Sequence, residues 1–228
     1  MHATLTPLHR AALPATAADA SGDSRVVRAL TRTAWAQAVL RAVAAASNLS
    51  FAHTRVAVLG TGPLAVELAT RTAATGARVI VVGDDPVALV EIAQLGLTVQ
   101  TTESAELRDA TIAFATGELT SPVTSALLGT GGPLLLVDAA EERPAVAAAT
   151  DPSTDPSSGR PGIDRIADAE RELFLLVARD VADGSARRTT EQLSARFAAA
   201  VEAAREQDPS PDDLHERADR ALALELLR

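Results

Sequence analysis

Apolar residues recur along the chain at two different spacings, and the change between them divides it into segments. From Ser24 to about Asn48 they recur every three or four residues, which is the period of one face of an amphipathic α-helix. Asp23 or Ser24 precedes the first apolar position and can cap this helix through a side-chain oxygen. The pattern predicts one long helix. Residues 1–22 show no sustained period, and we expect a flexible tail there.

From residue 55 onward, short apolar runs alternate with helical patterns. Gly76 and Gly96 stand where the first two of these helices should end. Because single helices separate the runs, the strands should pair in parallel through right-handed crossovers. The expected strands are 55–59, 77–82, 97–100, 111–115 and 133–137, and the expected helices are 63–75, 86–95, 103–109 and 121–128.

Beyond the strands the composition changes. Residues 151–162 are rich in Pro, Ser, Asp and Gly, which is typical of a linker. After it, residues 163–181 carry apolar side chains at helical spacing and predict a helix. A second helix should begin at Thr189, where Gln192 completes a capping box, and a third near Ser210, followed by Pro at its first position.

The G-x-G-x-x-A segment Gly60 to Ala65 follows the first predicted strand and opens the first predicted helix. Gly60 permits a tight turn, Gly62 allows a pyrophosphate to approach the backbone, and the small Ala65 lets helix and strand pack closely. The backbone N–H groups at the start of the helix then face the phosphates, so Thr61, Pro63 and Leu64 are also expected to contact the cofactor. The motif predicts dinucleotide binding, and the alternative is a Rossmann turn that is vestigial or differently occupied.

The expected fold class is therefore α/β, a Rossmann-type doubly wound parallel sheet of five or six strands with an N-terminal helix and a C-terminal helical extension. The predicted boundaries are a tail over 1–22, the dinucleotide-binding domain with its leading helix over 23–150, a linker over 151–162 and the extension over 163–228. The helices of the extension must bury apolar faces on the sheet or on another subunit, so we expect a homo-oligomer, most simply a homodimer.

An acid at the end of the second strand should accept hydrogen bonds from the adenosine ribose. Asp84 lies 22 residues after Gly62 and suits this role (84 − 62 = 22). Asp85 is a second candidate, although a cap of the helix beginning at Pro86 is the preferred interpretation for it. Two acids with no neighbouring Arg favour NAD over NADP. Asp138, at the end of the fifth predicted strand, is a weaker candidate for contact with a substrate.

Composition excludes several chemistries. The chain has no Cys and no Tyr, and all 21 of its basic residues are Arg, so a Walker A lysine, a Schiff base, a thiolate nucleophile and a Tyr-Lys proton relay are absent. The net charge of −9 argues against nucleic acid or an anionic membrane surface as a partner. We expect no metal site, no membrane span and a cytoplasmic location.

The segments NLSFAHTRVAVLGTGPLA, GARVIVVGDDPVAL, GLTVQTTESAELRDATIAFATG and GGPLLLVDAA resemble the cofactor domain of adenosylhomocysteinase over residues 40–140. The resemblance implies tightly held NAD, with Thr116 and Gly117 near the cofactor. The family's ribose-binding acid falls on Gly83, and its role would pass to Asp84. The family's substrate domain with its catalytic Lys, Asp and His has no counterpart here.

Two functions follow as hypotheses. The chain is expected to bind NAD and to assist a redox-type step on a nucleoside or related metabolite, or to be catalytically silent. The alternative is a non-catalytic homodimeric scaffold or regulatory protein that keeps the fold and pairs with itself or with a partner enzyme.

Overall fold

The computed structural model describes residues 24–121, 123–142, 144–146, 160–166, 171–208, 210 and 213–228. The predicted tail and residues 151–159 of the predicted linker lie outside this part. Contacts divide the chain into two compact units, of which residues 32–186 form the larger; the smaller combines residues 24–31 with residues 187–228.

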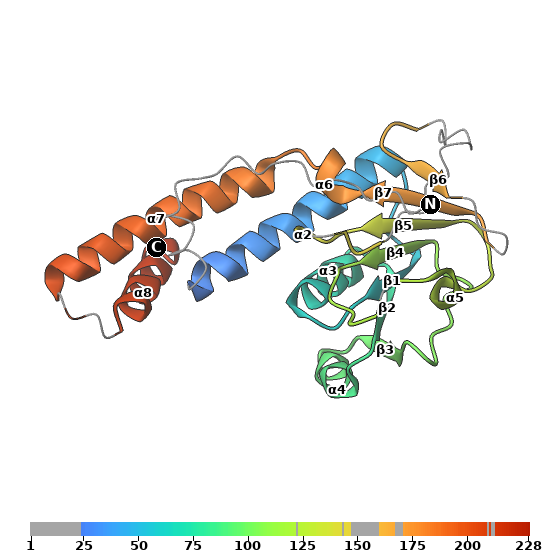
Figure 1. Ribbon diagram of the computed structural model, residues 1–228, viewed down its shortest axis with the longest axis horizontal. Helices are drawn as coiled ribbons and strands as arrows, with labels where there is room; N and C mark the ends of the chain where they lie inside the picture. The colour runs from blue at the N-terminus through green and yellow to red at the C-terminus, as the bar shows by residue number, and fades with distance from the viewer. Residues whose placement is uncertain are drawn as a thin grey trace, which may run out of the picture. The chain divides into compact units, whose positions relative to one another are not determined.

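The larger unit is built on one seven-stranded sheet with the order β3-β2-β1-β4-β5-β7-β6 (Figure 1). Every neighbouring pair is parallel except β6 and β7, which are antiparallel. Strand order reverses on either side of β1, as in a Rossmann half-domain, which confirms the predicted fold class. The sheet has seven strands where five or six were predicted, because β6 and β7 extend it beyond β5. The strands are β1 (Arg55–Leu59), β2 (Arg78–Gly83), β3 (Thr98–Thr101), β4 (Ile112–Ala115), β5 (Leu134–Asp138), β6 (Asp164–Ile166) and β7 (Leu173–Val177).

Helices α2 (Arg25–Ser47), α3 (Pro63–Ala74) and α4 (Pro86–Gln94) supply the core on one face of the sheet. They match the predicted helices to within about two residues at each end. Their buried side chains, among them Trp35, Val39, Leu68 and Ile92, pack against Phe114 and its neighbours on the strands. Each such burial contributes about 1.5–3 kcal/mol, so this face provides much of the stability of the unit.

The opposite face has a thinner cover, because two predicted helices do not form there. Residues 103–109 make turns, and only α5 (Ser125–Leu128), a single turn, replaces the helix predicted over 121–128. The buried guanidinium of Arg171 donates hydrogen bonds to the carbonyls of Leu107, Ala110 and Leu128. The Leu107 carbonyl also accepts from the Ala110 N–H at 3.0 Å, which closes a turn there, so we attribute the absence of the predicted helix to this long-range contact.

The prediction of a helix over residues 163–181 is wrong. The described residues of this segment, 163–166 and 171–181, form β6, β7 and the short α6 (Ala178–Val181). A run of five apolar residues such as Leu173–Val177 suits a buried strand as well as a helix, so periodicity cannot separate the two. Parallel pairing with β5, from Leu134 opposite Leu173 to Asp138 opposite Val177, decides for the strand.

The smaller unit contains most of α7 (Ser185–Gln207), α8 (Leu214–Leu226) and the first turns of α2. Its core consists of Val27, Leu193, Phe197, Val201, Ala218 and Leu222. Among the described residues, none of the helices is long and apolar enough to cross a lipid bilayer.

The ends of these helices differ in part from the predictions. Ser24 caps α2 as expected, because its Oγ accepts from the N–H of Val27 at 3.0 Å. The predicted start at Thr189 is wrong, since α7 begins at Ser185. The Asp183 carboxylate accepts a hydrogen bond from the backbone N–H of Ser185 at 3.0 Å. The capping box predicted from Thr189 to Gln192 therefore lies inside a helix. A helix was also predicted to begin near Ser210, and α8 begins at Leu214. Residues 211–212, which belong to the predicted start, lie outside the described part.

Candidate functional site

The turn between β1 and α3 has the geometry that the glycine motif predicts. Gly60 has φ +141°, a value that side chains rarely tolerate, and its N–H donates to the carbonyl of Val82 at 2.8 Å. Gly62 is the N-cap of α3, with Pro63 at the first helical position. Ala65 is fully buried, so the helix packs closely on the strand. The sequence therefore located this turn correctly.

A carboxylate of the protein itself lies at the N-terminus of α3. Glu118 Oε1 accepts from the N–H of Leu64 and Glu118 Oε2 from the N–H of Ala65, each at 2.9 Å. A Cβ added to Gly62 would stand 2.3 Å from Glu118 Oε1, so the glycine is what admits the carboxylate. These N–H groups are the donors that a pyrophosphate would use in a fold of this type. Sequence reasoning did not single out Glu118.

Asp84 and Asp85 take separate tasks after β2. The Asp84 carboxylate accepts from the backbone N–H of Thr120 at 2.7 Å and from the Thr120 hydroxyl. These bonds, the side-chain one first, hold the pKa of Asp84 below its usual value of 3.8. Asp85 caps α4 by accepting from the N–H groups of Val87 and Ala88 at 2.9 and 3.3 Å, which confirms the capping interpretation.

Gly83 stands beside the turn of residues 60–65, which we call the phosphate turn after the role predicted for it. A Cβ at Gly83 would lie 2.0 Å from the methyl carbon of Thr61. A side chain at the position that the resemblance assigned to a ribose-binding acid would therefore have to displace the Thr61 methyl group. In this chain Asp84 is the acid that faces the loop over the carboxyl end of the sheet.

Thr116 and Gly117 begin the loop that follows β4. Thr116 is buried, and its Oγ donates to the carbonyl of Leu59 at 3.0 Å, which ties the loop to the end of β1. Gly117 has φ +77°, and a Cβ there would meet the Cβ of Ala140 at 3.1 Å. The structure thus brings both predicted residues to the phosphate turn. Their contact with a cofactor stays a prediction.

Asp138 is used inside the protein. Its carboxylate is almost fully buried and forms an ion pair with Arg179 at 3.3 Å. It also accepts from the N–H groups of Ala140 and Ala145, each at 3.2 Å, and so shapes the segment after β5. These contacts occupy the oxygens that a substrate would need, and its predicted substrate contact remains a prediction.

A cavity of about 480 Å³ opens at the carboxyl end of the sheet beside Gly117. Its lining is mostly apolar, and Thr120 and Ser121 supply polar groups. The lining residues are Leu59, Gly117, Leu119, Thr120, Ser121, Val123, Pro144, Ala145 and Val146.

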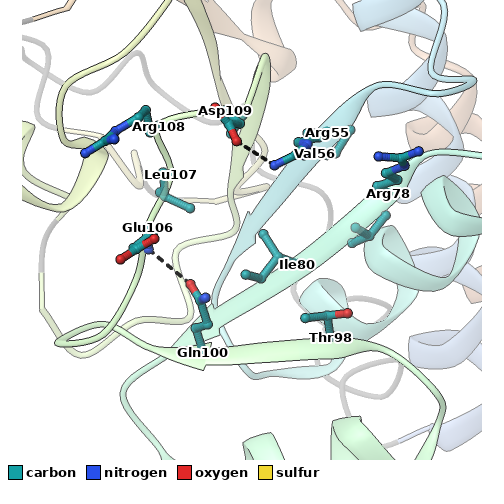
Figure 2. Close-up of a pocket in the computed structure, with 12 residues that line it drawn as sticks. Arg55, Val56, Arg78, Ile80, Thr98, Gln100, Glu106, Leu107, Arg108 and Asp109 are labelled. Atoms are coloured by element: carbon teal, nitrogen blue, oxygen red, sulfur yellow. Dashed lines mark hydrogen bonds and ion pairs between the residues drawn. The ribbon is translucent and has the colours of Figure 1, made fainter.

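A second pocket of about 470 Å³ lies at the opposite, amino end of β1 and β2, where the turns at 103–109 replace a helix. Figure 2 shows Arg55 paired with Asp109 and Gln100 bonded to the backbone of Glu106 around it. The predicted cofactor residues are absent from its lining. Because ligands of such folds bind at the carboxyl ends of the strands, the first cavity is the better candidate.

No protein-family model matches the chain, and no curated protein matches it in sequence. Solved structures match in fold. The A chain of dipicolinate synthase from Bacillus subtilis is 21% identical with a TM-score of 0.50, and the match covers 76% of this chain and 55% of that one. A transhydrogenase from Sinorhizobium meliloti is 16% identical with a TM-score of 0.49, and the match covers 80% of this chain and 58% of that one. An L-alanine dehydrogenase is 15% identical with a TM-score of 0.49, and the match covers 87% of this chain and 58% of that one.

The chain therefore spans little more than half the length of these proteins. At such identity the likeness shows a Rossmann-type fold and is not specific to adenosylhomocysteinase.

Proposed function

We propose that this chain binds a dinucleotide, NAD in the first place, across the carboxyl ends of β1, β2 and β4. The observation that carries the proposal is the pair of N–H groups on Leu64 and Ala65, which bind an anion at 2.9 Å beneath two glycines. A helix N-terminus with this geometry binds phosphate oxygens as readily as carboxylate oxygens. The fit requires Glu118 to leave the turn.

NAD suits the site better than NADP. The acid facing the loop is Asp84, and Asp85 is its neighbour, so a 2′-phosphate would meet two carboxylates. A ribose hydroxyl could instead donate to Asp84 in place of Thr120. NAD would supply hydride chemistry when bound, while the chain's own residues would bind and orient it.

A more specific proposal follows from the resemblance to the adenosylhomocysteinase cofactor domain. In it, the protein assists a redox-type step on a nucleoside or related metabolite held in the cavity of about 480 Å³. The apolar lining suits a flat ring, and Ser121 offers a hydroxyl for orientation. Chemistry that needs a Lys, Tyr or Cys proton donor would have to draw it from a partner, because the chain has none of these residues.

Calorimetric titration of the purified full chain with NAD and NADP tests the proposal. We expect binding of NAD that is at least about tenfold tighter than binding of NADP, corresponding to about 1.4 kcal/mol. A Glu118→Ala variant should be titrated alongside. If neither protein binds NAD at millimolar concentration, dinucleotide binding is refuted.

A second candidate is a non-catalytic scaffold or regulatory protein that pairs with itself or with an enzyme. The occupation of the phosphate turn by Glu118 favours it, because the fold then needs no ligand to satisfy these N–H groups. Leu224 and Leu227 are 53% and 84% exposed at the end of α8 and could contribute to a dimer. Light scattering should then show a dimer that Leu224→Glu with Leu227→Glu converts to a monomer; an unchanged mass would contradict it.

A further inference from the structure

We infer that residues 117–121, which we name the mimic loop, are an internal competitor that occupies both dinucleotide contacts at once and must swing away before a ligand binds. The inference rests on the proposed function and adds a regulation of the same site. Two separate groups of contacts carry it, one at the phosphate turn and one at Asp84.

At the phosphate turn the mimic loop presents a carboxylate where a phosphate would bind. The two oxygens of Glu118 each take one N–H of α3, from Leu64 and from Ala65. Two oxygens on consecutive helix-terminal N–H groups reproduce the charge and spacing of a phosphate at such a turn. A dinucleotide and Glu118 cannot hold the same donors together.

At Asp84 the mimic loop presents a hydroxyl where a ribose would bind. Thr120 donates from both its Oγ and its backbone N–H to Asp84 Oδ2. This is the kind of contact that a sugar hydroxyl makes with the acid after the second strand. The loop therefore imitates the phosphate and the sugar of one ligand within two residues of its own sequence.

The amino end of the mimic loop has a fixed residue followed by a glycine that can act as a hinge. Thr116 is buried and tied to Leu59, so the chain is fixed up to that residue. Gly117 follows with φ +77°, a conformation from which glycine can rotate at low cost. Leu119 and Thr120 line the cavity of about 480 Å³, so the same movement would open it further. Ligand entry and cavity opening are thereby coupled.

The coupling has a measurable size. A closed loop lowers the apparent affinity by the fraction of molecules in which the loop is open. Removing the carboxylate in Glu118→Ala should therefore tighten NAD binding by about tenfold or more. Glu118→Gln keeps the size of the side chain but not the charge and should show a smaller gain. Glu91→Gln removes the same charge from an exposed residue of α4, and this control variant should behave as the wild type.

The experiment titrates the full chain and these variants with pyrophosphate and with NAD, and follows thermal unfolding in pyrophosphate against sodium chloride of equal ionic strength. We expect pyrophosphate to bind and stabilise Glu118→Ala more than the wild type. Thr120→Val, which loses only the hydroxyl bond to Asp84, should gain affinity for both probes, because a loop that moves as a unit opens more often when either contact is weakened.

The outcomes separate the two claims. Equal binding of both probes by wild type and Glu118→Ala would overturn the mimic loop, and equal, measurable NAD binding would leave the proposed function standing. If Glu118→Ala gains pyrophosphate binding while no protein binds NAD, the internal competitor holds and NAD binding fails. If Glu118→Ala folds poorly, the smaller gain expected of Glu118→Gln decides the matter.

Discussion

Substitution of Arg171 tests what stabilises the turns on the sheet face opposite α2, α3 and α4. Only 3% of this residue is exposed, and burial lowers the pKa of its guanidinium. The group donates to four carbonyls at 2.5–3.0 Å from segments that are distant in sequence. These acceptors are Leu107, Ala110, Leu128 and Gly132. One side chain thus joins the turns before β4, the end of α5 and the turn before β5.

Arg171→Met keeps much of the volume and removes every donor. Leaving a buried acceptor without a partner costs about 1–3 kcal/mol, and part of this is recovered where a carbonyl can reach water. Hydrogen bonds to a charged group contribute about 1.5–3 kcal/mol each, and because several carbonyls lose one together we expect a loss of at least about 3 kcal/mol. Against a total stability of about 5–15 kcal/mol, this loss is large. Arg171→Lys keeps the charge without the planar fork, so about half of the loss should return.

Urea unfolding followed by circular dichroism measures these differences. Arg108→Met is the matched control, because Arg108 is an exposed neighbour on the same turn and should change stability by less than about 0.5 kcal/mol. If Arg171→Met unfolds within about 1 kcal/mol of the wild type, the guanidinium is not what organises these turns, and our explanation for the missing helix over 103–109 fails.

Three further predictions concern the carboxyl end of the sheet. Trp35→Phe removes the buried indole N–H that donates to the Ala139 carbonyl at 2.8 Å and should cost about 1–2 kcal/mol in urea unfolding; no measurable change would contradict it. Gly60→Ala places a Cβ 2.2 Å from Thr116 Oγ at a φ of +141°, whereas Gly96→Ala, at a φ of +81°, meets nothing within 4 Å. The first should therefore lower stability by about 1–3 kcal/mol more than the second in thermal melts, and equal losses would rule out the clash. Asp84 has a lowered pKa in the folded protein, so its stabilisation is present above about pH 4 and is lost as pH falls through the folded value. The difference in unfolding free energy between wild type and Asp84→Asn should shrink from pH 6 to pH 2.5, and a constant difference would contradict the linkage.

The phosphate turn was predictable because each of its residues answers a local requirement. Gly60 is fixed by its own φ, Gly62 by the approach of an anion, and Ala65 by the space between helix and strand. Such requirements are visible in a sequence without knowledge of the rest of the fold. The capping role of Asp85 was accessible for the same reason, since a cap acts on the two or three residues that follow it.

The features that escaped prediction depend on distant partners. Glu118 reaches N–H groups 53 and 54 residues away, and nothing in its own neighbourhood announces that contact. An acid shortly after a Thr-Gly pair at the end of a strand was the one available signal. Arg171 reorganises turns more than 60 residues earlier. The strand Leu173–Val177 needed knowledge of a free edge on β5 before a helix could be rejected.

The two borders of the sheet bear on whether copies of this chain can pair edge to edge. An open strand border is a template for pairing with another chain and so for aggregation. Here β6 has three residues and carries Asp164 and Arg165, with Arg165 paired to Glu172 at 3.1 Å. At the other border β3 has four residues and no fully buried side chain. Short, polar borders discourage sheet-to-sheet growth, so the edges of this sheet do not favour self-association.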